Sequence, residues 1–433
     1  MSTNKEILKL AIPNILSNIS IPLLSSVDTI LMGHLSVSHL GAVGIASMIF
    51  NFLYWNFGFL RMGTTGITAQ AFGENDTTKI RDTLGRALLL SIGLAFLIVF
   101  LAYPIQQISF SGMQVLPSQA DMVKDYYYTR LWAAPATLSI YACTGWFLGM
   151  QNAWYPLLVT IAVNVINIAV SYYCVVHLGL EVKGVALGTV IAQYCGVLLI
   201  IILILYKYKN LLHGLQIKIL TQWLELKKFL LINRDIFIRT ICLTFAFAYF
   251  YRSSSTQGET ILAVNLILLQ FLNWMSYGID GVAYASESLV GKYKGAQNYT
   301  QLKKVINKVI VWGAIFALIY TFIYYFFKRP LVQVFTSDNT LAATTEQYMY
   351  WVAILPLFAF LSYIWDGIYI GLTASKSMRN LMLIALVIYL ATHQILRQFM
   401  SENNSLWFAL LSFLLIRGLL QAYWYKKKGN AIE

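Results

Sequence analysis

Twelve apolar runs, each long enough to cross a lipid bilayer as a helix, constrain this sequence more than any other feature. A helix needs about 20 mainly apolar residues to span the hydrocarbon core. The runs lie near residues 9–33, 40–72, 86–109, 126–150, 155–178, 183–207, 228–252, 260–290, 303–328, 345–372, 379–400 and 405–425. Only 11% of the residues are charged, against about 25% in soluble domains. The sequence therefore predicts an all-α integral membrane protein with twelve transmembrane helices.

The basic residues predict how these helices are oriented. The formal net charge is +13, but Lys and Arg lie in the short gaps between apolar runs instead of on one face of a soluble domain, so we expect no nucleic-acid partner. Twenty of them fall in connections on the N-terminal side of the membrane. Five fall on the other side, namely Lys124, Lys183, Arg252, Lys328 and Arg329. The positive-inside rule then places both termini in the cytoplasm of a bacterial inner membrane.

The chain also repeats itself at an offset of half its length. Four features recur in the same order, and the residue numbers of each pair differ by nearly the same amount: Ala42-Val43 and Ala263-Val264, Phe52-Leu53-x-Trp55 and Phe271-Leu272-x-Trp274, Gly73 and Gly295, and Pro135…Gly145-x-x-x-Gly149 and Pro356…Gly367-x-x-x-Gly371. This predicts two pseudo-symmetric six-helix lobes, residues 1–207 and 228–433, joined by a cytoplasmic linker loop at 208–227. Because six is even, the lobes enter the membrane in the same orientation, with a substrate path expected between them.

In the first half, polar residues gather on single faces of three predicted helices. They are Asn14, Asn18, Ser25 and Asp28 on the first helix, Asn164, Asn167 and Ser171 on the fifth, and Thr189 and Gln193 on the sixth. A charge inside the membrane costs about 2.5–3.5 kcal/mol on insertion scales, so Asp28 requires a reason. We expect a shared interior pocket that includes Asp28. The alternative is that the polar residues form interhelical hydrogen bonds that hold the bundle together.

The second half carries its own intramembrane charges, which predict a polar network: Asp235, Arg239, Asp280, Glu287 and Asp366. Asp235 and Arg239 stand at i and i+4 with the acid first, a favourable spacing for a pair on one helix. We therefore expect a structural ion pair there. Asp280 and Glu287 either neutralise Arg239 or line a cavity of the second half, and the sequence favours neither.

No catalytic or metal site is evident in the sequence. It contains no Gly-rich phosphate loop, no Cys/His cluster and no nucleophile elbow, and its four cysteines lie singly within apolar runs. We expect no enzyme activity, no metal and no cofactor. Transport would then be driven by a proton or sodium gradient. Small organic substrates and the lipid bilayer are the expected partners, and we expect a monomer.

Several motifs resemble the DinF branch of the multidrug and toxic compound extrusion (MATE) family. They are Val27-Asp28-Thr29 with Gly33-His34-Leu35, Phe59-Leu60-Arg61-Met62-Gly63-Thr64-Thr65-Gly66, Asn233-Arg234-Asp235-Ile236, Asp280-Gly281-x-Ala283-Tyr284-Ala285 and Asp366-Gly367-x-x-Ile370-Gly371. The resemblance implies two six-helix lobes around a V-shaped cavity and efflux of organic, often cationic, compounds in exchange for protons or sodium. It also implies that the coupling aspartate is Asp28, with Asn167 and Thr189 lining its pocket.

One position departs from the family pattern and bears on the coupled ion. Where many members read Asn-Ile-x-Leu-Asp on the fifth helix, this sequence reads Asn167-Ile168-Ala169-Val170-Ser171, so a second pocket carboxylate is absent. We therefore predict an antiporter that exchanges drugs for protons. The alternatives are a sodium-coupled drug antiporter, with carboxylates of the second half as the ion site, a flippase for a lipid-linked cargo, and a polytopic membrane enzyme.

Overall fold

The computed structural model describes the backbone of residues 2–33, 35–214 and 216–432, and the side chains of these residues apart from 21, 23–30, 37, 217, 218 and 429–432. Every regular element in this part of the chain is a helix. In chain order they are α1 (Thr3–Gly33), α2 (Val37–Trp55), η1 (Asn56–Gly58), α3 (Phe59–Gly73), α4 (Thr77–Phe100), α5 (Ala102–Gly112), α6 (Ala120–Leu131), α7 (Ala134–Gly149), α8 (Trp154–Tyr172), η2 (Tyr173–His177), α9 (Glu181–Tyr208), η3 (Lys209–Leu212), α10 (Ile217–Leu220), α11 (Trp223–Ser255), α12 (Glu259–Gly295), α13 (Tyr299–Phe326), α14 (Lys328–Gln333), α15 (Asn339–Gly371), α16 (Ser375–Leu396) and α17 (Glu402–Ile432).

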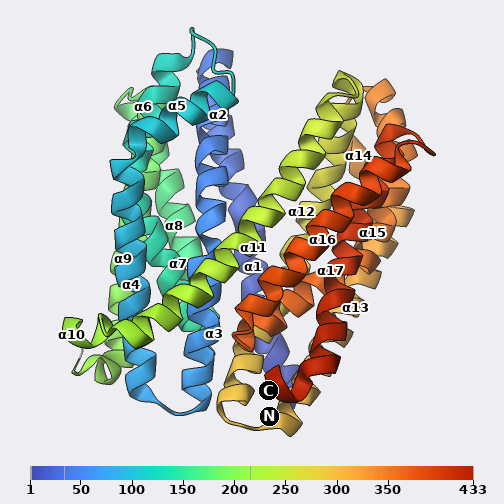
Figure 1. Cartoon of the computed structure of the whole chain (residues 1–433). Helices are drawn as coiled ribbons and strands as arrows, with labels where there is room; N and C mark the ends of the chain where they lie inside the picture. Colours follow the sequence, from blue (N-terminus) through green and yellow to red (C-terminus); the bar gives the residue numbers. More distant parts are fainter. Residues whose placement is uncertain (1, 34, 215, 433) are drawn as a thin grey trace. The chain divides into compact units, whose positions relative to one another are not determined.

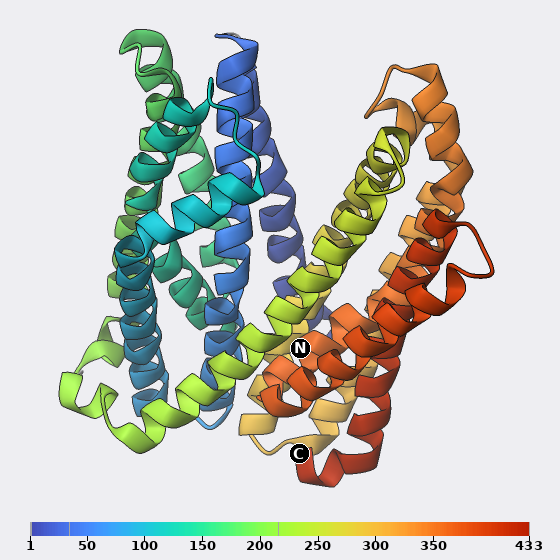
Figure 2. The ribbon, with the colours of Figure 1, turned by 45° about the horizontal axis from the view of Figure 1, so that its top comes forward.

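Nine stretches of the described chain are helical, long and apolar enough to cross a membrane, and each coincides with one of the predicted spans. The helices at the other three predicted positions are α1, the pair α6 and α7, and α11. Helix α11 carries Arg234, Asp235 and Arg239, which lower its apolar content. In Figures 1 and 2, most of the long helices within each half of the chain run side by side.

Two predicted spans of the first half are interrupted. Residues 86–109 divide between α4 and α5 at Leu101, and residues 126–150 divide between α6 and α7 at residues 132–133. A proline lies in the first turn of the helix that follows each break, Pro104 in α5 and Pro135 in α7. Proline lacks the N–H that would continue the preceding helix, but it fits the first turn of a new one. In the second half Pro356 lies inside the unbroken helix α15.

The chain forms two compact units whose bounds differ from those of the predicted lobes. One unit comprises residues 16–230, and the other comprises residues 1–15 together with 231–433. The first turns of α1 pack within the second unit. There the hydroxyl of Tyr293 donates to Glu6 Oε2 at 2.6 Å, and a Cβ on Gly281 would lie 2.3 Å from Ile15 Cγ1. Residues 1–15 are thus built into the unit formed by the C-terminal half.

The internal repeat has a structural counterpart in the closest helix contacts of each unit. In α7, a Cβ on Gly145 would lie 2.3 Å from the carbonyl oxygen of Arg61 on α3. In α15, a Cβ on Gly367 would lie 2.4 Å from the carbonyl oxygen of Ala283 on α12. Small residues let helix backbones approach closely inside a membrane. The repeated Gly-x-x-x-Gly motif therefore forms the same kind of helix contact twice.

Backbone conformation follows the repeat as well. Asn75 and Gln297 have φ of 57° and 53°, and Gln151 and Thr373 have φ of 60° and 50°. Both pairs have the same spacing in the sequence as Gly73 and Gly295. Each of these four residues follows a helix that ends in glycine, where a left-handed residue closes the last turn. The internal repeat therefore keeps the spacing of Gly73 and Gly295 from these glycines up to at least Gln151 in the first half and Thr373 in the second.

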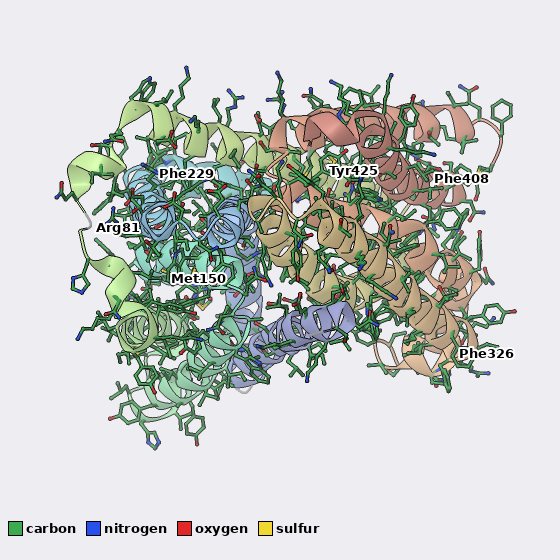
Figure 3. The ribbon with its side chains drawn as sticks, turned by 90° about the horizontal axis from the view of Figure 1, so that it is seen from below. Arg81, Met150, Phe229, Phe326, Phe408 and Tyr425 are labelled. Atoms are coloured by element: carbon green, nitrogen blue, oxygen red, sulfur yellow. The ribbon has the colours of Figure 1, made fainter. Side chains whose placement is uncertain are left out.

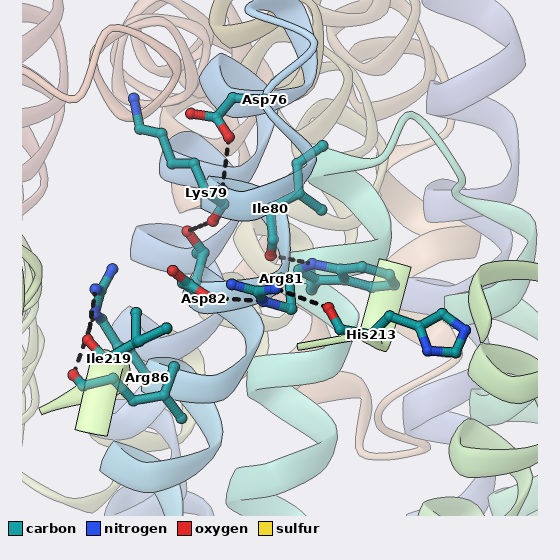
Figure 4. A network of polar contacts seen from close by, with 11 residues as sticks. Asp76, Lys79, Ile80, Arg81, Asp82, Arg86, His213 and Ile219 are labelled. Atoms are coloured by element: carbon teal, nitrogen blue, oxygen red, sulfur yellow. Dashed lines mark hydrogen bonds and ion pairs between the residues drawn. The ribbon is translucent and has the colours of Figure 1, made fainter. Parts of the chain in front are cut away.

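The linker between the predicted lobes is fastened to α4 by two arginines (Figure 4). Arg86, which is buried, donates through Nε to the carbonyl oxygen of Leu220 and through Nη2 to that of Ile219, each at 3.3 Å. Arg81 Nη1 donates to the carbonyl oxygen of His213 at 2.8 Å. Phe229 packs on Ala87 and Ala142 beyond the linker. In Figure 3, Arg81 and Phe229 both lie where the light-green segment passes α4. The linker therefore belongs to the compact unit of residues 16–230.

Candidate functional site

In the first unit, three of the predicted pocket residues form one hydrogen-bonded cluster between α8 and α9. Asn167 Nδ2 donates to Thr189 Oγ1 at 2.8 Å, and Ser171 Oγ donates to Asn167 Oδ1 at 3.4 Å. Thr189 Oγ1 in turn donates to the carbonyl oxygen of Val185, 3.1 Å away. Asn167, Ser171 and Thr189 are all buried. The cluster supplies neutral oxygen and nitrogen atoms and no charge.

A glycine makes this cluster possible. A Cβ on Gly188 would lie 2.1 Å from Ser171 Oγ and 2.7 Å from Ser171 N. Any larger residue would push α8 and α9 apart. The resulting close approach lets the short side chain of Thr189 reach Asn167 across the helix interface.

The first helix lies against α8 beside this cluster. Ser17 Oγ donates to Thr160 Oγ1 at 3.0 Å. One turn further along both helices, Asn164 Nδ2 donates to the carbonyl oxygen of Ser20 at 3.2 Å. The side chain of Asn164 therefore joins α8 to α1, whereas that of Asn167 joins α8 to α9. These bonds fix the stretch of α1 that precedes Asp28 on the α8 face.

The remaining residues of the predicted first-half site are placed as follows. Asp28 and Ser25 lie in α1, but their side chains are outside the described part of the structure. Asn14 donates to the carbonyl oxygen of Leu10 in its own helix at 2.8 Å. Gln193 lies one turn after Thr189 and is partly buried. The pocket around Asp28 thus stays a prediction, supported by the cluster beside it.

The second unit contains a buried charge network that joins α11, α15 and α17. Asp366 on α15 forms ion pairs with Arg239 of α11 and Arg417 of α17, and Gln421 Nε2 donates to its Oδ1 at 2.7 Å. Arg417 Nη2 also donates to Ser362 Oγ at 2.7 Å. Asp366 and its three partners are each at most 6% exposed as whole residues. Two guanidinium groups therefore neutralise this carboxylate.

The predicted pairing of Asp235 with Arg239 is wrong. Asp235 instead accepts from Arg379 of α16 at 2.6 Å and from the neighbouring Arg234 at 2.9 Å. Arg239 reaches across to Asp366. A pair at i and i+4 is worth only about 0.2–0.5 kcal/mol, whereas a buried charge left without a partner costs several times more. Interhelical pairing therefore prevails over the local one.

Asp280 and Glu287 both lie on α12 and have further partners. Asp280 is partly buried and interacts electrostatically with Arg417 and Tyr363. Glu287 is 2% exposed, and its backbone carbonyl faces Gly371, whose Cβ position is 2.8 Å away. The sequence left open whether Asp280 and Glu287 neutralise Arg239. In the structure, Asp366 forms the ion pair with Arg239. Arg417 and Gln421 were missed, although an arginine within the apolar run 405–425 was a visible sign.

No group of three or more His, Cys, Asp or Glu side chains suited to holding a metal ion occurs among the residues that were described. The cysteines at 143, 174, 195 and 242 are all free thiols, and three of them are buried. The polar contacts described in the two units are hydrogen bonds and ion pairs within helix bundles.

Comparison with known proteins identifies this helical architecture. The MatE family model matches residues 13–173 and again residues 236–395. The chain belongs to the MATE family. The two matches cover the two halves of the repeat, as expected for the family's twelve helices in two pseudo-symmetric six-helix lobes. The fold predicted from the sequence is confirmed.

The relatives place the chain near the DinF branch of the MATE family. It is 34% identical to DNA damage-inducible protein F of Escherichia coli over 99% of this chain and 94% of that protein. It is 23% identical to a probable multidrug resistance protein, NorM, of Thermotoga maritima, over 77% of this chain and 72% of that one. A solved structure described as the outward-facing conformation of a multidrug resistance MATE transporter matches with a TM-score of 0.90 at 18% identity, over 100% of this chain and 97% of that chain. The protein is a multi-pass membrane transporter of the MATE family.

Proposed function

We propose that this MATE transporter is a secondary antiporter that exports small organic, often cationic, compounds in exchange for protons. Asp28 would carry the coupled proton. The neutral Ser171 is buried at the position where a second pocket acid would lie, next to the neutral Asn167 and Thr189, and this supports the assignment. A sodium ion in a low-dielectric site needs several oxygen ligands and compensating negative charge, whereas one carboxylate suffices for a proton.

The charge network of the second unit also favours a proton over sodium. A sodium site there would draw on Asp280, Glu287 or Asp366, or on Asp235. Asp280 interacts electrostatically with Arg417. Asp366 already has two arginine partners, and Asp235 has Arg379 and Arg234. A cation bound at either carboxylate would face guanidinium groups at close range, which costs energy in a buried site. The sodium-coupled alternative is therefore the weaker one.

The membrane setting is part of the proposal. The protein would reside in a bacterial inner membrane with both termini in the cytoplasm, as the distribution of Lys and Arg predicts, and would act without enzymatic chemistry, cofactor or nucleic acid. Maleimide labelling from outside intact cells tests this orientation. A cysteine at Ser118 should react and one at His213 should not, since both positions are exposed and the predicted spans place them on opposite sides of the membrane. Labelling of His213→Cys from outside would contradict the topology.

The coupling ion is tested with purified protein in liposomes loaded with ethidium. A pH gradient alone should drive ethidium movement, and a sodium gradient at fixed pH should not. Asp28→Asn should remain folded and lose the pH-driven movement. Asp121→Asn is the matched control, because Asp121 is an exposed acid in the first turn of α6, and it should transport as the parent protein does. Ethidium movement driven by sodium alone and retained in Asp28→Asn would refute proton coupling at this residue.

A further inference from the structure

The repeat assigns counterparts in the second unit to the candidate pocket of the first. At the spacing that relates Gln151 to Thr373, Asn167 of α8 corresponds to Tyr389 of α16, and Ser171 corresponds to His393. Nearer the start of the chain, Ala42 and Ala263 are separated by one residue fewer than Gln151 and Thr373 are. At that separation, Asp28 corresponds to Tyr249 of α11. The three counterparts lie on two different helices, α11 and α16. The repeat alone does not say whether they are close together in space.

Tyr249, Tyr389 and His393 form one cluster within the second unit. The hydroxyl of Tyr249 lies 2.7 Å from His393 Nδ1. The ring of Tyr389 meets the ring of Tyr249 edge to face, with centroids 5.7 Å apart. Tyr389 is 0% exposed and His393 is 2% exposed. The only histidine of the second unit is thus buried at the repeat counterpart of the candidate coupling pocket.

The hydrogen bonds of this cluster leave one side of the imidazole open. Gln394 Nε2 donates to the hydroxyl oxygen of Tyr249 at 3.2 Å, and Tyr249 is bonded to His393 Nδ1. His393 Nε2 and the hydroxyl of Tyr389 are both buried, with no hydrogen-bond partner within the described structure. A neutral imidazole carries one N–H donor and one acceptor nitrogen. When Nδ1 donates to Tyr249, Nε2 is therefore a buried base with an unused lone pair.

The charges that face His393 are few and of opposite sign. Glu402, at the start of α17, and Arg397, just after α16, interact with it electrostatically. The other polar groups around the ring, Tyr249, Tyr389 and Gln394, are neutral. A positive charge on the imidazole would be attracted by Glu402 and opposed by Arg397. Gln394 is exposed and Tyr249 is partly exposed, so a hydrogen-bonded connection joins the buried ring to the surface.

We propose that His393 is a second proton-binding site of this transporter, held by Tyr249 and located where the repeat places the counterpart of the Asp28 pocket. The proposal rests on the proton exchange proposed above and adds a second titrating group in the other unit. The proton binds to the free nitrogen of the imidazole, and no other bond forms or breaks. Because Nε2–H of the charged ring would then lack an acceptor in this arrangement, protonation favours a rearrangement of the end of α16. Each half of the repeat thus contributes its own proton site.

The site is tested directly by NMR on the full-length protein labelled with ¹⁵N in histidine side chains. The signal that disappears in His393→Gln identifies His393. In the parent protein that signal should follow a one-proton titration as the pH is lowered from 8 to 4, and Tyr249→Phe, which keeps the ring and removes the hydroxyl, should shift its midpoint. A His393 signal that stays constant over this range, while circular dichroism shows the protein folded, would overturn the proposal.

Proton counting links the site to transport. Ethidium is added to the purified protein in weakly buffered detergent solution, and the protons released are measured with a pH indicator. His393→Gln should release about one proton fewer than the parent, whereas His177→Gln, which removes an exposed histidine of the other unit, should release the same number. Equal release from His393→Gln and the parent at every pH would exclude His393 from the exchange. Absence of any release from the parent would instead refute the exchange itself, and the NMR titration would still decide whether His393 binds a proton.

Discussion

Arg239 of α11 forms a buried ion pair with Asp366 of α15, 127 positions further along the chain. Both side chains are 8% exposed, and Arg417 approaches the same carboxylate at 3.6 Å. The carboxylate of Asp366 therefore joins three helices of the second unit, α11, α15 and α17. Its energetic weight can be measured because removal of the acid leaves two arginines buried without their counter-ion.

Asp366→Asn should destabilise the second unit by about 3–5 kcal/mol, since breaking a buried pair leaves an uncompensated charge. The matched control is Glu346→Gln, also on α15, because Glu346 pairs with the exposed Arg329 at 3.8 Å. Exposed pairs contribute about 0–1 kcal/mol. Denaturant unfolding in detergent, followed by tryptophan fluorescence, measures both. A cost for Asp366→Asn as small as that of the control would mean that the network is dispensable.

The repeated glycines should tolerate no added methyl group. Gly145→Ala and Gly367→Ala place a Cβ within 2.4 Å of a backbone carbonyl oxygen, and overpacking of this kind costs about 1–3 kcal/mol. Gly93→Ala in α4 is the control, because nothing lies within 4 Å of its Cβ position and alanine is the better helix former. Thermal unfolding should separate the two classes. Unchanged melting temperatures for Gly145→Ala and Gly367→Ala would contradict the close helix contacts.

In the first unit, Thr189→Val should leave the amide of Asn167 without its acceptor. An unsatisfied buried donor costs about 1–3 kcal/mol, whereas replacing both partners with apolar groups is less harmful. The double variant Asn167→Leu with Thr189→Val should therefore cost less than the sum of the two single changes. A double-mutant cycle of unfolding free energies tests this. Strict additivity would show that the 2.8 Å bond carries no coupling energy.

The start of α11 should loosen in acid. A hydrogen bond from Lys228 lowers the pKa of Glu225, with smaller contributions from Arg86 and Lys79. Because the pKa is lower in the folded state, the stabilisation is present above the ordinary glutamate pKa of about 4.3 and is lost as the pH falls through the folded-state value. Hydrogen exchange of the first turn of α11, corrected for intrinsic rates, should speed up between pH 6 and pH 3.5. Glu225→Gln should lose this pH dependence.

Arg86 should control the mobility of the linker. Its guanidinium bonds two successive carbonyls, those of Ile219 and Leu220, a geometry that the single ammonium of lysine does not reproduce. Arg86→Ala and Arg86→Lys should both increase protease cleavage within residues 209–222. Arg81→Ala should have a smaller effect because its bond to His213 is exposed. Resistance to cleavage in Arg86→Ala would show that these two hydrogen bonds do not hold the linker in place.

The positions of the helices were predictable from the sequence because membrane burial imposes long apolar runs. The repeat was predictable too, since Gly145 and Gly367 occupy equivalent contacts in α7 and α15. The breaks before α5 and α7 were missed. Pro104 and Pro135 were visible in the sequence, but a proline in an apolar run fits either a break or a continuous helix such as α15.

The partners within the candidate sites were less predictable. The contact of Asn167 with Thr189 followed from two polar faces on neighbouring helices. The ion pairs did not follow, because local spacing favours Asp235 with Arg239 while the three-dimensional packing brings Arg379 and Asp366 closer. His393 gives no signal in the sequence, because it is a single histidine within an apolar run. Its correspondence to Ser171 becomes meaningful once the left-handed backbone conformations after the helices fix the spacing of the repeat.

The packing of residues 1–15 in the second unit has a consequence for the order of assembly. Glu6 is translated 287 residues before its partner Tyr293. Contacts of such long sequence separation form late and slow folding. Residues 1–15 therefore cannot complete this packing until the whole first unit, residues 16–230, has been synthesised. The second unit is thus assembled from two segments that translation separates by an entire compact unit.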